Sequence, residues 1–349
     1  MGGNAVLLKE LTAARGVSGN ENEIRGLLLK LAEACGAVCS VDRMGNLVAQ
    51  KDGGDSAAPH VLLAAHMDEV GLIVTGIRDD GLIRYKPVGG IDSRVMVSKP
   101  VLCGEDRVPG VIGAKAIHLQ SASDRERVLG HDQLFIDIGA KTKAEAEKLC
   151  PPGTYVVFDS PMDPLGDGMY ASRALDDRVG CLTLLSALSH GYRGKLTCAF
   201  TVQEEVGLRG AQVIGHYMDH DLAIVMEGTA ANDLGDVPFE KQVCCVRKGV
   251  VISHIDHASI AHPGLREAME AVAIKAGIPH QPKRYVSGGN DAGPLQRGAG
   301  AKPTVVLSVP CRYIHSPASV AADMDIQAQA DLTNAFLDAL PTVWAQISK

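Results

Sequence analysis

Four apolar runs, each followed closely by a histidine or a carboxylate, constrain the fold of this chain more than any other feature of its sequence. Val61–Ala65 is the clearest run: it is continuously apolar, which is typical of a strand covered on both faces, and it ends at His66. The other runs span 195–200, 222–226 and 304–309, and they precede Glu204 and Glu205, Glu227, and His315 respectively. Ligands in open α/β sheets bind outside the carboxyl ends of the strands, so these side chains are predicted to share one sheet edge.

The adjacent carboxylates Glu204 and Glu205 favour a functional site over core packing, because ionised carboxylates are costly to bury without a partner. Taken alone, however, the pair is better explained as two solvated loop acids, which are common on protein surfaces. Asp176 begins a predicted helix after a long loop and can reach the same sheet edge. Two histidines with several carboxylates form a ligand set suited to Zn, Co or Mn, and the lack of thiolates favours a catalytic centre with open positions.

Each candidate also has a plain structural interpretation. His66 could be a core histidine whose ring is satisfied by a backbone carbonyl, and His315 could be a loop histidine. Asp176 and Asp177 could cap the helix that follows them, and Glu227 could be a solvated strand end. The coincidence of these residues at four strand ends favours a shared site.

The pattern of the chain changes after Gly71, where short apolar strands alternate with Gly, Pro and Asp at short intervals. The strands predicted in this region are 72–74, 82–85, 95–97, 101–103, 109–113 and 135–138, with one helix at 142–149 and a polar loop at 120–132. Residues 72–163 are therefore predicted to form an all-β, barrel-like module. This module would interrupt an α/β domain made of residues 1–71 and 164–349.

Composition narrows the class of protein. The 349 residues carry a formal net charge of −7 and no basic run, so a nucleic-acid partner is not expected. No apolar run exceeds the length of a strand, so neither a transmembrane helix nor a membrane partner is expected. The nine cysteines form no CxxC pair, and the N-terminus lacks the pattern of a signal peptide. These features favour a cytoplasmic protein with free thiols.

Five motifs appear in a fixed order and carry a family resemblance over essentially the whole chain. They are His66–Gly71 (HMDEVG), Ala174–Arg178 (ALDDR), Glu204–Ala211 (EEVGLRGA), Gly288–Ala292 (GGNDA) and Arg312–Pro317 (RYIHSP). The chain resembles the dinuclear metallo-aminopeptidase family of glutamyl aminopeptidases and tetrahedral aminopeptidases, some members of which are labelled endoglucanases. The resemblance implies a catalytic α/β sandwich domain of the zinc-exopeptidase type, interrupted by a barrel-like dimerisation domain.

The resemblance also implies a role for each site residue. Asp176 would bridge two divalent metal ions, Zn or Co with Mn as a further candidate. His66 and Glu227 would complete one metal site. The ligands of the second site would be Glu205 and His315. Glu204 would be the general base, Asp68 would orient His66, and the Asp176–Asp177 peptide bond is expected to be cis.

Two positions depart from the family pattern. Glu227 stands where the family often has Asp; the longer acid can still coordinate a metal, with a possible change of metal preference. Asn290 stands where Thr is more frequent, which leaves the role of its loop open. His254, His257 and His262 form a further cluster in the sequence, with no family role, and are interpreted as surface or subsite residues rather than ligands.

The predicted reaction is removal of N-terminal residues from short peptides by a metal-bridged hydroxide, with Glu204 as proton acceptor. The partners expected are peptide substrates and further copies of the chain, with a dodecamer built from dimers as the expected assembly. Glycoside hydrolysis is an alternative, but it needs two unligated carboxylates and aromatic platforms, and only one Trp and 4% aromatic residues are present. A non-catalytic assembly protein is the other alternative, and it would have no need of the intact ligand set.

Overall fold

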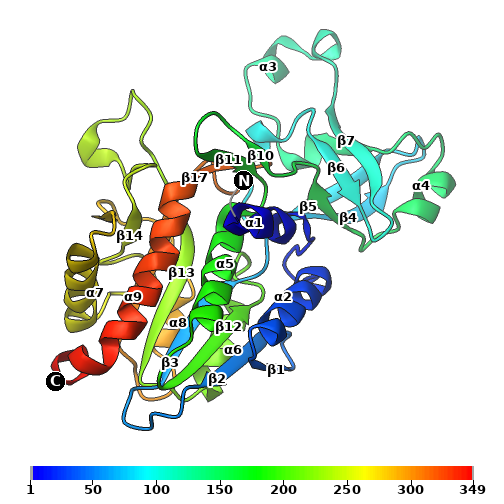
Figure 1. The fold of residues 1–349 in the computed structure, drawn as a ribbon. Coiled ribbons are helices and arrows are strands. Elements are labelled where there is room, and N and C mark those ends of the chain that lie inside the picture. The colour runs from blue at the N-terminus through cyan, green and yellow to red at the C-terminus, as the bar shows by residue number, and fades with distance from the viewer. Residues whose placement is uncertain (1–2, 348–349) are drawn as a thin grey trace.

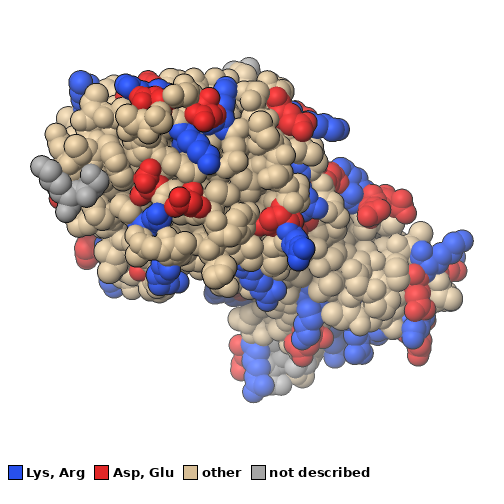
Figure 2. All heavy atoms as spheres, turned by 90° about the horizontal axis from the view of Figure 1, so that it is seen from below, with Lys and Arg blue, Asp and Glu red and all other residues tan. Residues whose placement is uncertain are grey.

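A computed structural model describes residues 3–347, and these form a large mixed sheet covered by helices with a closed β-barrel beside it (Figure 1). The predicted fold class, α/β with a barrel-like all-β unit, is confirmed. Within the described range, no helix has the length and apolar character needed to cross a membrane. On the face shown in Figure 2, basic and acidic side chains are interspersed, so neither charge dominates that face.

The large sheet has eleven strands, and its central strands are parallel. The order along the main path is β1-β2-β12-β3-β13-β16-β17-β11-β10, and β14 and β15 join it beside β16. The strands at its centre, from β12 through β3 and β13 to β16, pair in parallel, whereas the outer pairs on this path are antiparallel. Bounds are β1 Val38–Val41, β2 Leu47–Asp52, β3 Val61–His66, β10 Asp163–Pro164, β11 Met169–Ser172, β12 Lys195–Thr201, β13 Leu222–Ala230, β14 Val250–Ile252, β15 His280–Pro282, β16 Thr304–Arg312 and β17 Ser319–Ala322.

Helices cover both faces of this sheet, which explains the continuous apolar runs of its central strands. In β3, Leu63 and Ala65 join the larger core with α1, α2, α5, α7 and α9, while Leu62 and Ala64 face the smaller core with α6 and α8. All six residues of β3 are buried. The helices are α1 Gly3–Ala13, α2 Asn22–Ala34, α5 Leu175–His190, α6 Arg209–Tyr217, α7 Pro263–Ala276, α8 Ala292–Gln296 and α9 Asp323–Ile347.

The barrel is formed by six antiparallel strands that lie between β3 and β10 in the chain. Its strands close in the order β4-β5-β8-β7-β6-β9 and enclose a hydrophobic core of their own. The bounds are β4 Gly71–Ile77, β5 Ile83–Val88, β6 Pro100–Cys103, β7 Val108–Ala114, β8 Leu134–Asp137 and β9 Tyr155–Phe158, with α3 Ala122–Arg125 and α4 Lys143–Leu149 in the connections. The helix predicted at 142–149 is confirmed as α4, and Thr142 caps it by accepting from the Glu145 N–H.

Two local predictions in the barrel are wrong. Residues 95–97 do not form a strand, because Ser93–Val95 is a 3₁₀ turn whose N-cap, Asp92, accepts a hydrogen bond from the Arg94 N–H. The polar segment 120–132 is not wholly a loop, since it contains the single-turn helix α3. One turn is too short to leave a helical period in the sequence, so pattern alone could not have revealed it.

Candidate metal centre

The parallel register of the central strands brings the predicted site residues to one edge of the sheet. His66 is the last residue of β3, Glu227 lies within β13, and β12 leads into the loop that carries Glu204 and Glu205. His315 follows β16 in a loop where its own φ is +55°. These four strands are consecutive neighbours in the sheet, so side chains that are far apart in the sequence become adjacent.

Asp176 lies between the two histidines. Its Oδ1 is 3.4 Å from His66 Nε2 and its Oδ2 is 3.8 Å from His315 Nε2. Beyond each histidine stands a glutamate: Glu227 Oε2 is 3.7 Å from His66 Nε2, and Glu205 Oε2 is 3.2 Å from His315 Nε2. The arrangement is that of one central carboxylate with a histidine and a glutamate on each side.

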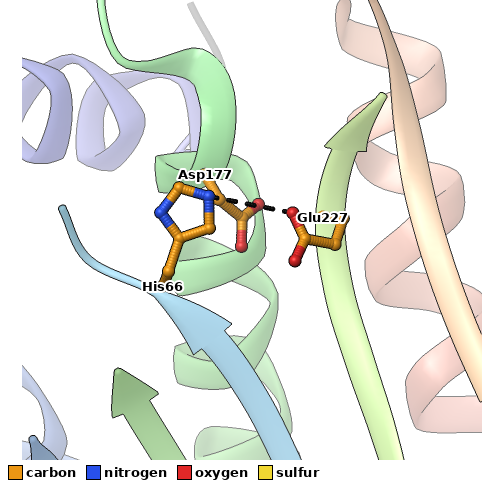
Figure 3. A group of neighbouring side chains, drawn as sticks. All are labelled: His66, Asp177 and Glu227. Carbon is orange, nitrogen blue, oxygen red and sulfur yellow. Dashed lines mark ion pairs between the residues drawn. The ribbon is translucent and has the colours of Figure 1, made fainter. Parts of the chain in front are cut away.

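Asp177 is a member of the cluster that sequence reasoning considered only as a helix cap. Asp177 does cap helix α5, since its Oδ1 accepts a hydrogen bond from the Gly180 N–H at 3.0 Å. Its buried Oδ2, however, has no hydrogen-bond partner. Figure 3 shows Asp177 at the start of α5, facing His66 and Glu227, with the pair between His66 and Glu227 dashed. The Asp176–Asp177 peptide bond is cis, as expected.

Burial dominates the electrostatics of this cluster, and repulsion between its carboxylates adds to it. Burial raises the pKa of Glu204 to about 8, and the neighbouring carboxylates of Asp291, Asp68 and Asp176 add to the effect. Burial and the nearby carboxylates likewise raise the pKa values of Glu205 and Glu227 well above their ordinary range. The ionised forms of these carboxylates are therefore disfavoured, first by loss of solvation and then by mutual repulsion, unless positive charge is supplied.

The side chains fit divalent cations. His66, Asp177 and Glu227 offer ligand atoms within 4.8 Å of one another, and His66, Asp176 and Glu205 form a second such group. Glu227 Oε1 is buried without a hydrogen-bond partner, so this oxygen is free to coordinate. Imidazole nitrogen and carboxylate oxygen are ligands that Zn²⁺ and related ions accept.

Asp68 contacts two predicted metal ligands, His66 and Glu205, and the predicted base, Glu204. The carboxylate is fully buried and accepts the backbone N–H groups of Glu204, at 3.0 Å, and Glu205, at 3.2 Å, together with the Ser18 hydroxyl at 2.6 Å. His66 Nδ1 lies 3.2 Å from the Asp68 carbonyl oxygen and 3.4 Å from the carboxylate. Burial by itself would raise the pKa of Asp68, but the contacts with His66 and these donors outweigh it and lower the pKa.

The barrel also contributes to the wall of the site. At the end of β5, a Cβ added to Gly89 would lie 3.4 Å from the Glu205 Cβ and only 2.8 Å from the Val70 Cγ1. A Cβ added to Gly90 would lie 3.6 Å from His315 Nδ1. Glycine is required at position 89, where φ is +83° and an added Cβ would clash with Val70, whereas at position 90 an added Cβ would only reach ordinary van der Waals contact with His315.

A cavity of about 190 Å³ opens over the cluster. Asn290 lines this cavity, yet its side chain is occupied: it donates to Asp256 Oδ2 at 2.9 Å and accepts the Ala292 N–H at 3.0 Å. His254, His257 and His262 do not line it. His254 is paired with Glu270, and His262 caps α7 by accepting the Leu265 N–H.

Four residues at or near the site escaped sequence reasoning. Asp177 was visible only as a cap, and Ser18 lies in a turn between two helices that follows none of the four apolar runs. Asp291, which stands within one of the quoted motifs, is buried and accepts a hydrogen bond from the Thr201 hydroxyl. Lys283 lines the cavity from a segment with no periodic pattern.

Comparison with known proteins identifies the family. The family model described as M42 glutamyl aminopeptidase matches residues 45–332 of this sequence. A second family model, described only as AMPT, matches residues 5–27. A protein of Acetivibrio thermocellus named as a putative aminopeptidase is 35% identical over 324 residues, which are 92% of this chain and 94% of that protein. The lysyl aminopeptidase of Pyrococcus furiosus is 32% identical over 346 residues, 96% of each chain.

Solved structures agree with this result. An aminopeptidase from the archaeon Desulfurococcus kamchatkensis has a TM-score of 0.93 and 32% identity, with 99% of this chain and 98% of that chain covered. The TET1 peptidase of Pyrococcus horikoshii, described as assembling into a tetrahedron or a large octahedral shell, has a TM-score of 0.84 and 34% identity, with 96% and 99% covered. The chain belongs to the M42 family of aminopeptidases and is therefore a peptide hydrolase.

Proposed function

We propose that this aminopeptidase works with two divalent cations, Zn or Co with Mn as a further candidate, held around Asp176. The observation that carries the proposal is the position of Asp176, with one carboxylate oxygen toward His66 and the other toward His315. Glu227 would complete the group on the His66 side, and Glu205 the group on the His315 side. Once bound, such cations lower the pKa of a water molecule toward neutrality and so provide the nucleophile.

Glu204 is the proposed proton carrier. It lines the cavity, its Oε2 lies 4.0 Å from His66 Nε2, and its backbone is fixed by Asp68. Its raised pKa suits a carboxylate that takes a proton from water and holds it until the leaving amine needs one. The other carboxylates of the cavity suit a free α-amino group, so the substrate class is short peptides with an unblocked N-terminus.

Glycoside hydrolysis is not favoured. That reaction needs two carboxylates free to act on the sugar, whereas the carboxylates of this cluster converge on the two histidines. Hydrolysis of aminoacyl anilides and of carboxymethyl cellulose by the same metal-loaded preparation separates the two activities, and also tests for a protein with neither.

The roles of Glu204 and Glu205 are tested by exchanging each for Gln, which has the same size but cannot accept a proton at neutral pH. Glu204→Gln should keep its metal content while turnover falls about 10²–10⁴-fold, as for a lost general base. Glu205→Gln should lose part of its metal, because a neutral amide is a poor ligand, and excess metal should restore some activity. Glu147→Gln, on the exposed surface of α4, is the matched control and should behave as the unaltered enzyme.

Elemental analysis alongside turnover decides the outcome. Loss of metal from Glu204→Gln together with full retention by Glu205→Gln would reverse the two roles. Equal activity in both variants and in the control would remove both residues from the mechanism.

We further propose that the chain forms a homo-oligomer, with a dodecamer built from dimers as the expected form. The proposal is supported by the likeness to the TET1 peptidase and by the barrel, which is the part of the chain that resembles the family's dimerisation domain. Light scattering in a metal-replete buffer measures the mass directly. A monomer throughout the micromolar range would contradict the proposal.

A further inference from the structure

One cationic side chain reaches the cavity over the acidic cluster. Among the described residues that line the cavity, Lys283 is the only Lys or Arg, while Asp176, Glu204 and Glu227 are its acids. The remaining wall near Lys283 is uncharged and includes Ser287, Gly288 and Gly289. The cavity therefore has an acidic side, where the cations are proposed to bind, and a separate positive group.

The backbone around Lys283 is held in place by the large sheet. The residue directly follows β15, and its N–H donates to the Ile252 carbonyl at 3.4 Å. The next residue, Arg284, donates its N–H to the Val243 carbonyl at 2.9 Å, and its guanidinium carbon lies 4.3 Å from the centre of the Phe239 ring. Arg284 is thus engaged elsewhere, and of the two neighbouring cations only Lys283 lines the cavity.

The Lys283 ammonium keeps binding capacity for an anion. Its Nζ donates to the Ser287 carbonyl at 2.8 Å, which uses one of three donors. Within the described part of the chain, no carboxylate lies within 4.0 Å of this nitrogen, so its charge is not neutralised by an ion pair. A partly buried cation with free donors attracts a carboxylate more strongly than it would in open water.

We propose that Lys283 makes this enzyme select peptides whose N-terminal side chain is acidic. The inference rests on the proposed aminopeptidase function: with the scissile carbonyl beside Glu204, the side chain of the N-terminal residue lies in the same small cavity as the ammonium. A Glu or Asp side chain would accept the free donors of Lys283. The relatives do not settle the matter, because the family model is described as glutamyl and one relative is a lysyl aminopeptidase.

A purely structural role for Lys283 makes a different prediction. The bond to Ser287 could serve only to hold the 283–287 segment, in which case replacing Lys283 would affect all substrates alike. Specificity is therefore measured as a ratio of kcat/KM values for two substrates that differ in charge and not in size. The glutamyl and glutaminyl anilides form such a pair.

The experiment compares the full-length, metal-loaded enzyme with Lys283→Met and Lys283→Arg on the glutamyl, glutaminyl and lysyl anilides. The unaltered enzyme should prefer the glutamyl over the glutaminyl substrate by at least tenfold in kcat/KM. Lys283→Met should bring that ratio close to one, mainly through a higher KM for the glutamyl substrate. Lys283→Arg keeps the charge and should retain most of the preference.

Two outcomes overturn the inference and leave the proposed function standing. The first is an unaltered enzyme that hydrolyses the glutaminyl or the lysyl substrate as well as the glutamyl one. The second is a Lys283→Met variant that keeps the original glutamyl-to-glutaminyl ratio, whatever its absolute rate. Failure of the metal-loaded enzyme to hydrolyse any aminoacyl anilide would instead refute the proposed function, and the inference with it.

Discussion

Replacing Asp68 by Asn removes one negative charge without changing the size of a fully buried side chain. The carboxylate has four donors around it: the N–H groups of Glu204 and Glu205, the Ser18 hydroxyl, and the more distant Nδ1 of His66. An amide has only one oxygen. Whichever way the Asn side chain turns, its NH₂ group faces the N–H of Glu204 or of Glu205.

The size of the effect follows from this count. One buried N–H without an acceptor costs about 1–3 kcal/mol, and each remaining bond loses about 1 kcal/mol when its acceptor is no longer charged. The hydroxyl of Ser18 can rotate and accept instead of donating, so it adds little. We expect Asp68→Asn to lower the free energy of unfolding by about 2–5 kcal/mol. Disturbing a group that supports metal ligands should also lower metal affinity or turnover about 10–100-fold.

The assay pairs chemical denaturation with activity under metal titration. Asp106→Asn, an exposed aspartate of the barrel, is the control and should match the unaltered enzyme in both measurements. In Asp68→Asn, saturating metal should restore part of the activity and leave the lower denaturation midpoint in place. An Asp68→Asn enzyme with an unchanged midpoint and unchanged turnover would refute the view that this carboxylate holds the Glu204–Glu205 segment.

Three further outcomes are expected. Exhaustive chelation should abolish hydrolysis and Zn or Co should restore it; full activity in a sample shown by elemental analysis to be metal-free would contradict the metal centre. Arg178→Met should lower the free energy of unfolding, measured by urea denaturation, by at least about 3 kcal/mol, because the fully buried guanidinium donates to three backbone carbonyls. Burial lowers the pKa of His60 to about 4 in the folded protein. As the pH falls from 6.5 to 4, His60 is protonated in the unfolded chain but not in the folded one, so the free energy of unfolding should decrease over this range. His60→Gln should make that fall shallower, and equal pH dependence in both proteins would exclude His60 as its source.

The fold could be predicted well where several independent signals agree. Val61–Ala65 is continuously apolar because helices cover both faces of β3, and the same reasoning held for β12, β13 and β16. Parallel pairing of these strands then brings their carboxyl ends together, so the proximity of His66, Glu205 and His315 followed from topology. The prediction that Glu227 follows its strand is wrong, because β13 continues past it to Ala230. Their roles as ligands or base stay predictions.

The sequence was less informative where local chemistry competes with pattern. The apolar run Val95–Val97 resembles a strand, but the side chain of Asp92 caps a tight turn there, and Met96 is fully buried beside it. Lys283 shows that pairing between short strands also limits prediction from sequence. Its position over the acidic cluster depends on β15 pairing with β14, a contact between short strands that no periodicity reveals.

The close approach of Gly89 and Gly90 to Glu205 and His315 has a consequence for engineering and evolution alike. The barrel could therefore not simply be exchanged for an unrelated domain at its two junctions. Deleting it would remove the backbone that packs against Glu205 and His315 of the candidate metal centre, and any replacement would have to reproduce the left-handed glycine at position 89. Mutations in this turn should be classed with those of the active centre, although they lie in the part of the chain that resembles an assembly domain.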